Sequence, residues 1–358
     1  MNITFMIGNG FDIGLGMRTS FKDFFDIYCA KALKKDEDIR QLAMCIATDK
    51  NAWSYFERQL GKYTAQFDKD TLWLFYAQIR DFTEEFIKYL KQQEERLSFD
   101  DEKLIVQTLQ NALTGFYKNG VLPVESAERI DGVFQSYKAE EHRYNFISFN
   151  YTDALQRCVE KLKDGMVTTR NYSTVQRIDR VGKIVNVHGM EDHNPIMGVN
   201  DVSQIENQKL AEIPSFVDRL VKPRLNARIQ MNNEKRAAEI LGSSKIICIY
   251  GMSLGETDRD WWNRVIAWLN GDSERQLVIF DFDPQYTASV PMNWLDKQDA
   301  IIACLASHNR NKDISVEKLQ GRIHLAVYKN ILSMPLTEKS DRVYEEALLK
   351  FRALQRKA

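Results

Sequence analysis

The sequence predicts an open, doubly wound α/β protein with a mostly parallel sheet and a large helical insertion. Short runs that are apolar on both faces recur along the chain, and helical patterns lie between several of them. A long helical stretch also follows the first strand and helix. Strands covered by helices on both faces form such continuous apolar runs, and alternation of strands with helices favours a parallel sheet.

The first strand is predicted at residues 3–7, because ITFMI is apolar and is closed by Gly8 and Gly10. Ser20 followed by Asp23 resembles a capping box, which predicts a helix over residues 21–35. The chain then reads as helical to about residue 143. The strongest helix is at residues 71–97, where large apolar side chains recur every three or four positions, a pattern typical of packing.

Strand patterns return from residue 145 onward. They are expected at residues 145–149, 183–187, 245–250, 276–280 and 324–328, with a weaker pattern at 300–305. Helices are expected at residues 152–162, 258–270 and 315–319, in a polar inserted stretch at 203–240 and at the terminal segment 338–356.

Composition excludes several functional classes. A formal net charge of −1 gives no global basic field for nucleic acid or acidic membranes. The five cysteines are scattered without a CxxC pair, so no local zinc site is expected. The spacing of His188 and His193 is not a recognised metal signature, so we expect no other metal. Free thiols fit a reducing compartment, and no apolar run reaches the roughly 18 residues that a membrane span needs. We therefore expect a cytoplasmic protein without a membrane partner. The sequence is compatible with a homo-oligomer.

The glycine-rich loop after the first strand predicts a Rossmann-like nucleotide site. Ligands of an open parallel sheet bind outside the carboxyl ends of its strands. Glycine lets backbone amides approach a phosphate, and a following helix N-terminus favours its charge. The expected nucleotide-binding residues of this loop are Gly8, Asn9, Gly10, Phe11 and Asp12. A simple glycine-rich turn is the alternative.

Other strand ends carry polar residues. Asn150 is expected to orient a water or a ribose hydroxyl, although an Asx turn or helix cap explains it equally well. His188 at a strand tip is a candidate general base, with a structural histidine as the alternative. The loop at 251–258 offers Gly251, Ser253, Leu254 and Asp258, and the strand at 276–280 is followed by the carboxylates Asp281 and Asp283. We predict a nucleotide-binding domain at 1–35 and 144–358, and a helical insertion at 36–143.

In order along the chain, GNGFDIGLGMRTSFKDF, FNYT, VHG and YGMSLGETD resemble the AbiH family of bacterial abortive-infection proteins. This resemblance implies a role in phage defence, in which infected cells stop growing. The same motifs are similar, more distantly, to sirtuins and sirtuin-like NAD-cleaving domains.

The sirtuin resemblance aligns Gly8–Gly10, Asn150, His188 and the loop at 251–253 with the sirtuin glycine loop, asparagine, catalytic histidine and phosphate loop. It implies that Asp281 or Asp283 contacts a ribose. Two sirtuin features are missing: an Asp two residues after the Asn, and the paired zinc cysteines, whose absence argues against a protein deacylase.

The leading functional hypothesis is hydrolysis of the nicotinamide–ribose bond of NAD. In it Asn150 orients the ribose or a water, His188 acts as base, Asp12 stabilises the developing cation, and backbone amides of the two glycine loops hold the pyrophosphate. One alternative is a non-catalytic nucleotide sensor that acts through partner proteins. Another is an RNA-binding or RNA-cleaving effector, weighed against an ordinary solvated helix face. Its contacts would be Arg219, Lys222, Arg224, Arg228, Lys235 and Arg236. The third alternative to NAD hydrolysis is a purely structural role.

Overall fold

The computed structural model describes residues 1–53, 55–118, 120–190, 195–229, 232–282, 291–327 and 329–338. They form two compact units. The sheet unit comprises residues 1–15, 99–187 and 233–335, and the helical unit comprises residues 16–98 and 188–232 together with the described residues 336–338. These divisions fall at other positions than the predicted domain boundaries.

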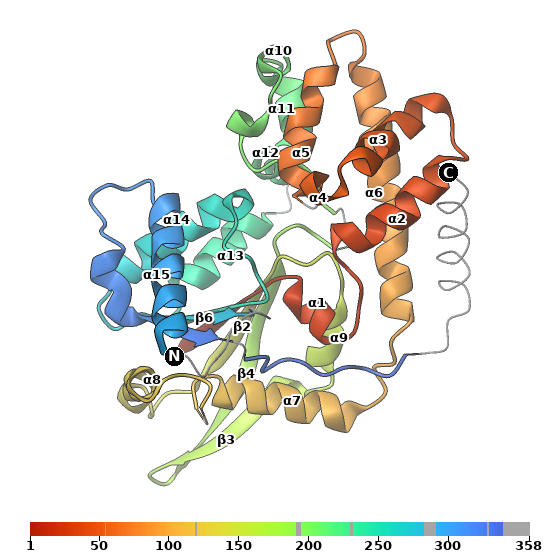
Figure 1. The fold of residues 1–358 in the computed structure, drawn as a ribbon. Helices are drawn as coiled ribbons and strands as arrows, with labels where there is room; N and C mark the ends of the chain where they lie inside the picture. Colours follow the sequence, from red (N-terminus) through yellow and green to blue (C-terminus); the bar gives the residue numbers. More distant parts are fainter. Residues whose placement is uncertain are drawn as a thin grey trace. The chain divides into compact units, whose positions relative to one another are not determined.

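The sheet unit, which Figure 1 shows as a ribbon, contains a sheet. Its seven strands have the order β3-β4-β2-β1-β5-β6-β7. The strands are β1 Asn2–Ile7, β2 Arg143–Ser148, β3 Met166–Tyr172, β4 Val175–Asn186, β5 Ile246–Tyr250, β6 Gln276–Asp281 and β7 Ile323–Val327. All neighbouring pairs are parallel except β3 with β4. The mostly parallel α/β sheet that the sequence predicts is therefore confirmed.

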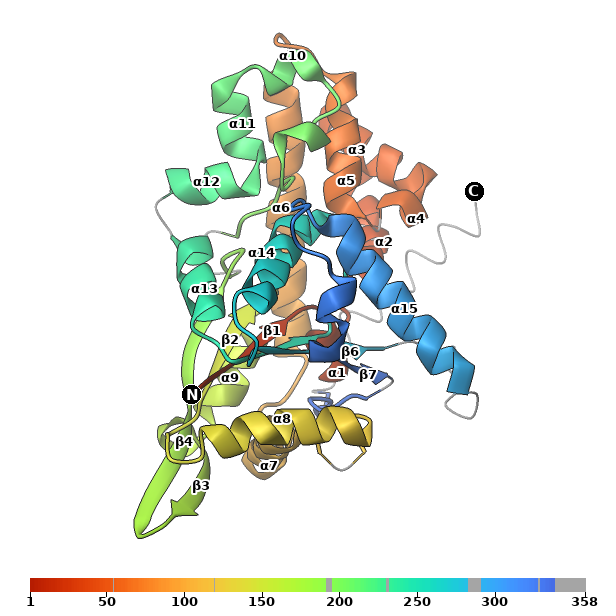
Figure 2. The same ribbon diagram turned by 90° about the vertical axis from the view of Figure 1, so that its left-hand side faces the viewer.

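Helices cover both faces of this sheet (Figure 2). On one face lie α7 Glu102–Gly115 and α8 Val124–Ser136, and the ring of Phe5 meets that of Phe116 edge-on with centroids 5.6 Å apart. The sequence places α7 and α8 in the helical insertion, but their apolar sides pack on the sheet.

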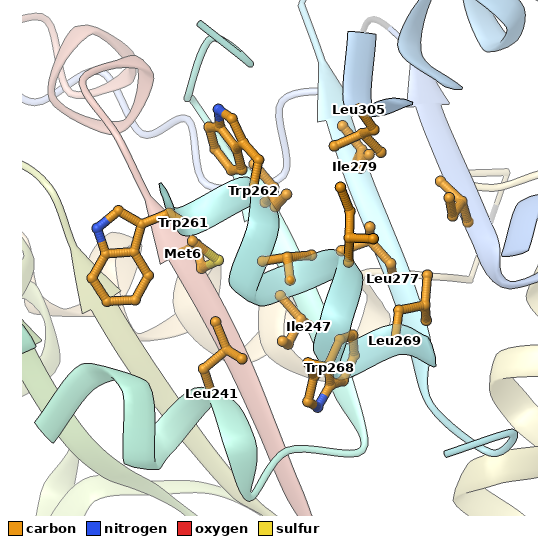
Figure 3. Close-up of a cluster of buried hydrophobic side chains, with 14 of the residues drawn as sticks. Met6, Leu241, Ile247, Trp261, Trp262, Trp268, Leu269, Leu277, Ile279 and Leu305 are labelled. Carbon is orange, nitrogen blue, oxygen red and sulfur yellow. The ribbon is translucent and has the colours of Figure 1, made fainter. Parts of the chain in front are cut away.

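The other face is covered by α13 Asn233–Gly242, α14 Arg259–Asn270 and α15 Pro291–His308. Fully buried Trp262 belongs to the apolar cluster between these helices and the strands (Figure 3). The prediction of a strand at residues 300–305 is wrong, because this segment lies inside α15. Its buried Ile301, Ile302 and Leu305 are spaced as on one side of a helix.

Most other predicted elements of this unit are confirmed. The helix expected at 152–162 is α9 Ala154–Glu160, and the one at 315–319 is the 3₁₀ turn η5 Glu317–Arg322. Another 3₁₀ turn, η2 Lys163–Gly165, precedes β3. The sequence misses β3, since this edge strand is largely polar and half exposed. The predicted terminal helix lies outside the described residues, except for residue 338.

The helical unit encloses a core of aromatic side chains. Its first part contains α2 Phe21–Ala32, α3 Glu37–Thr48, α4 Lys50–Trp53, α5 Phe56–Tyr63, η1 Thr64–Gln66 and α6 Leu72–Glu95. Phe82 of α6 is fully buried, and its ring stacks on Phe56 with centroids 4.5 Å apart. The predicted stripe at 71–97 is thus confirmed as packing.

The polar stretch at 203–240 is not one helix. It contains η3 Val202–Gln204, α10 Gln208–Ala211, α11 Pro214–Leu220 and α12 Lys222–Arg228 of the helical unit, followed by α13 of the sheet unit. Pro214 and Pro223 lie in the first turns of α11 and α12, where the missing amide is tolerated, and Val221 between them is extended. The six basic residues considered for RNA therefore share no helix face.

No helix in the part of the chain that the structure describes is both long and apolar enough to cross a membrane.

The start of α2 provides a first testable prediction. Ser20 has extended backbone angles, and its hydroxyl accepts a hydrogen bond from the amide of Asp23 at 3.2 Å. Loss of an N-terminal cap costs about 1 kcal/mol, so we expect Ser20→Ala to lower the free energy of unfolding by that amount. Urea unfolding measures it, and Ser20→Thr, which keeps a capping hydroxyl, should recover most of the loss.

Candidate functional site

The loops that follow β1 and β5 touch each other directly. The amide of Gly8 donates to the carbonyl of Tyr250 at 3.0 Å, and that of Gly10 donates to the carbonyl of Gly251 at 2.8 Å. A Cβ on Gly10 would lie 2.5 Å from the Cα of Gly251, closer than atoms can approach. Gly251 has a φ of +66°, which glycine adopts without strain. The glycines therefore allow two strand ends to pack backbone against backbone.

This packing corrects one part of the predicted mechanism. The amides of Gly8 and Gly10 are engaged with the β5 loop, and the amide of Phe11 donates to the carbonyl of Gly8 at 3.0 Å. An amide that already donates to a protein carbonyl does not hold a phosphate as well. The amides of Gly8 and Gly10 are therefore not open to a pyrophosphate, while the predicted contribution of the loop at 251–253 stays a prediction.

Asp12 joins the first loop to the end of β2. It lies in the short helix α1 Gly10–Gly14, is 1% exposed, and accepts hydrogen bonds from two side chains of the β2 loop. The Nδ2 of Asn150 donates to its Oδ1, and the Oγ1 of Thr152 donates to its Oδ2, each at 2.9 Å. The structure thus brings together Asp12 and Asn150, which are 138 residues apart in the chain.

These bonds fix the orientation of the Asn150 amide. Its backbone amide donates to the Oγ of Ser148 at 3.3 Å, and its Nδ2 is turned toward Asp12. Its Oδ1 accepts no hydrogen bond from any residue within the described ranges. The side chain is therefore held in one orientation, and its Oδ1 can accept a hydrogen bond from a hydroxyl or a water.

The sequence analysis missed Asn186. This residue ends β4 beside Ser148, is 8% exposed, and its Oδ1 accepts a hydrogen bond from the Nε2 of Gln156. Its buried Nδ2 has no partner among the described residues. A buried unsatisfied donor costs about 1–3 kcal/mol, so an accepting water or ligand is favoured there. The signal was present, because asparagine is an unusual residue in the otherwise apolar KIVNV strand.

Side chains of α14 and α15 hold the loop that follows β5 through its backbone carbonyls. The carbonyl of Leu254 lies 2.9 Å from the Nε2 of His308 on α15, and that of Gly255 accepts from the indole of Trp262 at 2.8 Å. Ser253 is exposed, whereas Asp258 precedes α14 without a capping bond from its side chain. Thus Leu254 is anchored through its backbone, while Ser253 and Asp258 stay predicted ligand contacts.

The carboxylates after β6 are only partly described. Asp281 ends the strand and forms an ion pair with Lys297 at 2.9 Å. Asp283 lies outside the described residues. Contact of either carboxylate with a ribose stays a prediction.

His188 belongs to the helical unit and is nearly buried. Burial, together with the positive charge of Lys222, holds the pKa of His188 well below its usual range. Lys222 itself is 3% exposed and forms an ion pair with Glu57, so it is not available as a surface contact for RNA. The imidazole is neutral near pH 7, as a general base must be, but that role stays a prediction.

The buried histidines predict a dependence of stability on pH. Burial lowers the pKa of His324 to about 4, in the same direction as for His188. Below pH 6.5 these histidines become protonated in the unfolded chain but stay neutral in the native protein. The free energy of unfolding therefore falls as pH falls. For His324 the loss between pH 6.5 and 5 is about 2 kcal/mol, at 1.36 kcal/mol per pH unit. Urea unfolding at pH 7 and pH 5 should show a smaller difference for His324→Gln; an equal one would contradict this assignment.

Residues 4–280 match the family model described as bacteriophage abortive infection AbiH, which is well over half of the chain. The chain belongs to the AbiH family. The match includes Asp12, Thr152 and both asparagines of the site, and the expected link to phage abortive infection is thereby supported. A search among curated proteins found no match. The sirtuin resemblance stays a prediction.

Proposed function

We propose that this AbiH protein binds a nucleotide at the carboxyl edge of its sheet and hydrolyses the N-glycosidic bond of NAD or a related dinucleotide. Numbered by chain order, the six parallel strands run 3-2-1-4-5-6, the Rossmann-like order of dinucleotide-binding folds. Ligands of such sheets bind where the order reverses, which here is between β1 and β5. The touching loops lie at this edge. So do Asp12, Asn150 and Thr152, which we call the Asp12 group.

The observation that carries the proposal is the fixed amide of Asn150. With Nδ2 donated to Asp12, its Oδ1 is left as an acceptor for a ribose hydroxyl or for the attacking water. Asp12 then acts as a positioning residue rather than by direct contact with the cation, because both of its oxygens already accept hydrogen bonds.

The reaction demands little covalent chemistry from the protein. The C–N bond breaks with its electron pair leaving on neutral nicotinamide, the oxygen of water bonds to the ribose carbon, and the water proton is released. The transition state resembles an oxocarbenium ion, which preorganised dipoles stabilise. An oxygen held in place by Asp12 supplies such a dipole without reorganisation.

Two assays on the purified full chain test the proposal. Nicotinamide release from NAD measures turnover, and calorimetric titration with ADP-ribose measures binding. We expect Asn150→Ala to lower kcat by about 100-fold, the scale of one preorganised group. Asn171→Ala, at an exposed position of β3, is the matched control and should behave as the wild type. Absence of both ADP-ribose binding and nicotinamide release would refute the proposal.

A nucleotide sensor is the second candidate. The full occupancy of the Asp12 oxygens favours it, because no charged group of the cluster is left open for chemistry. ADP-ribose binding that depends on Asn150, without nicotinamide release, is the result that identifies a sensor.

A further inference from the structure

We propose that the sheet unit has a second ligand site, at the amino edge of the sheet, which binds a sugar phosphate such as the ribose-phosphate part of a nucleotide. A cavity of about 570 Å³ opens there, at the opposite ends of the strands from the Asp12 group. The starts of β1 and β2, a bend in β4 and the last turn of α13 form its walls. Its volume suits a ligand of nucleotide size, since small-molecule pockets span roughly 300–1,000 Å³.

An irregularity in β4 shapes this cavity. Tyr144 pairs with Val181 and Phe146 with Ile184, so Asn145 faces two residues, Gly182 and Lys183. Such a bulge redirects side chains, and bulges are common beside functional sites. A Cβ on Gly182 would lie 2.3 Å from the Oδ1 of Asn145, so a side chain at this position would displace the amide.

Asn145 is the central recognition group. It is 6% exposed, and its Oδ1 accepts a hydrogen bond from the amide of Lys183 at 2.9 Å. That bond fixes which end of the side chain is the donor, and Nδ2 donates to none of the residues that the structure describes. A nearly buried amide that lines a cavity with an unused donor is suited to an anionic oxygen.

The charges around the cavity are complementary to a sugar phosphate. Arg143 and Lys183 are exposed cations, and Lys183 forms no ion pair with any residue in the described ranges. Arg143 is 4.0 Å from Glu141, which leaves Lys183 as the open charge for a phosphate. Glu239 on α13 is also exposed without an ion pair to a described residue, and a carboxylate accepts hydrogen bonds from sugar hydroxyls.

The end of α13 does not oppose an anion strongly. Its last carbonyls already accept hydrogen bonds: Ile240 from Ser243 and Ser244, and Gly242 from Arg275. The negative end of the helix dipole is carried by such carbonyls when they are unsatisfied. Their capping leaves Glu239 as the main negative group that faces the ligand.

Calorimetric titration of the full chain with ribose 5-phosphate tests the site. We expect saturable binding that is at least tenfold tighter than that of ribose or of inorganic phosphate. Asn145→Asp keeps the acceptor for the Lys183 amide but replaces the free donor with a negative charge, so it should weaken binding at least tenfold. Lys183→Ala should do the same, and because that side chain is exposed the variant is expected to fold normally.

Two controls separate this site from the proposed NAD site. Lys312→Ala removes an exposed lysine elsewhere in the same unit, and Asn150→Ala removes the acceptor that the proposed NAD site offers to a ribose hydroxyl. Both should bind ribose 5-phosphate as the wild type does. Absence of saturable binding, wild-type affinity in both cavity variants, affinity for inorganic phosphate equal to that for the sugar phosphate, or loss of binding in Asn150→Ala would each overturn the proposal.

Discussion

Gly10→Ala is expected to lower the free energy of unfolding by about 3 kcal/mol, the upper part of the range for overpacked positions. The new Cβ would lie 2.5 Å from the Cα of Gly251 and 3.2 Å from its carbonyl carbon and oxygen. All three are backbone atoms, so no side-chain rotation relieves the contact. Relief requires β1 and β5 to separate, at the cost of the Gly10–Gly251 hydrogen bond. Urea unfolding followed by tryptophan fluorescence measures the loss.

Gly14→Ala is the matched control for this experiment. It lies at the end of α1, and a Cβ there would be no closer than 3.6 Å to another atom, which is ordinary contact. Alanine also favours a helical backbone over glycine, so stability should stay the same or rise slightly. Equal destabilisation by the two substitutions would show that the contact with Gly251 is not the cause.

Asp12→Asn is expected to reduce nicotinamide release by about 100-fold, because it removes the carboxylate that holds the Asn150 amide. The new side chain offers one oxygen where two donors need acceptors, so either Asn150 or Thr152 loses its partner. An unsatisfied buried donor also costs about 1–3 kcal/mol of stability. Both effects have the same origin in the burial of the group.

Steady-state kinetics distinguish positioning from a general loss of structure. The drop should appear in kcat, while affinity for ADP-ribose changes by less than about threefold, because orientation of Asn150 matters most in the transition state. Asp313→Asn, at an exposed position, is the control. Wild-type kcat in Asp12→Asn would rule out the positioning role, whatever the stability of the variant.

Local patterns predicted much of this fold. The apolar runs identified six of the seven strands, and the Ser20 cap and the α6 stripe were recognised from spacing alone. The candidate positions at Gly10, Asp12 and Asn150 also followed from their place at strand ends. Each of these signals lies within a few residues of the chain, where backbone geometry and side-chain period act directly.

Local sequence patterns could not predict the contacts between residues that are far apart in the chain. The apolar pattern at 300–305 does not distinguish a strand from one side of α15, and nothing local shows that α7 covers the sheet. The partners of Asp12 and the unused donors of Asn186 and Asn145 are likewise set by segments far apart in the chain. The amino-acid sequence thus specified the strands and their polar ends, because propensity and periodicity are short-range. The long-range packing of backbone and side chains alone decided which polar groups are satisfied and which are left for a ligand.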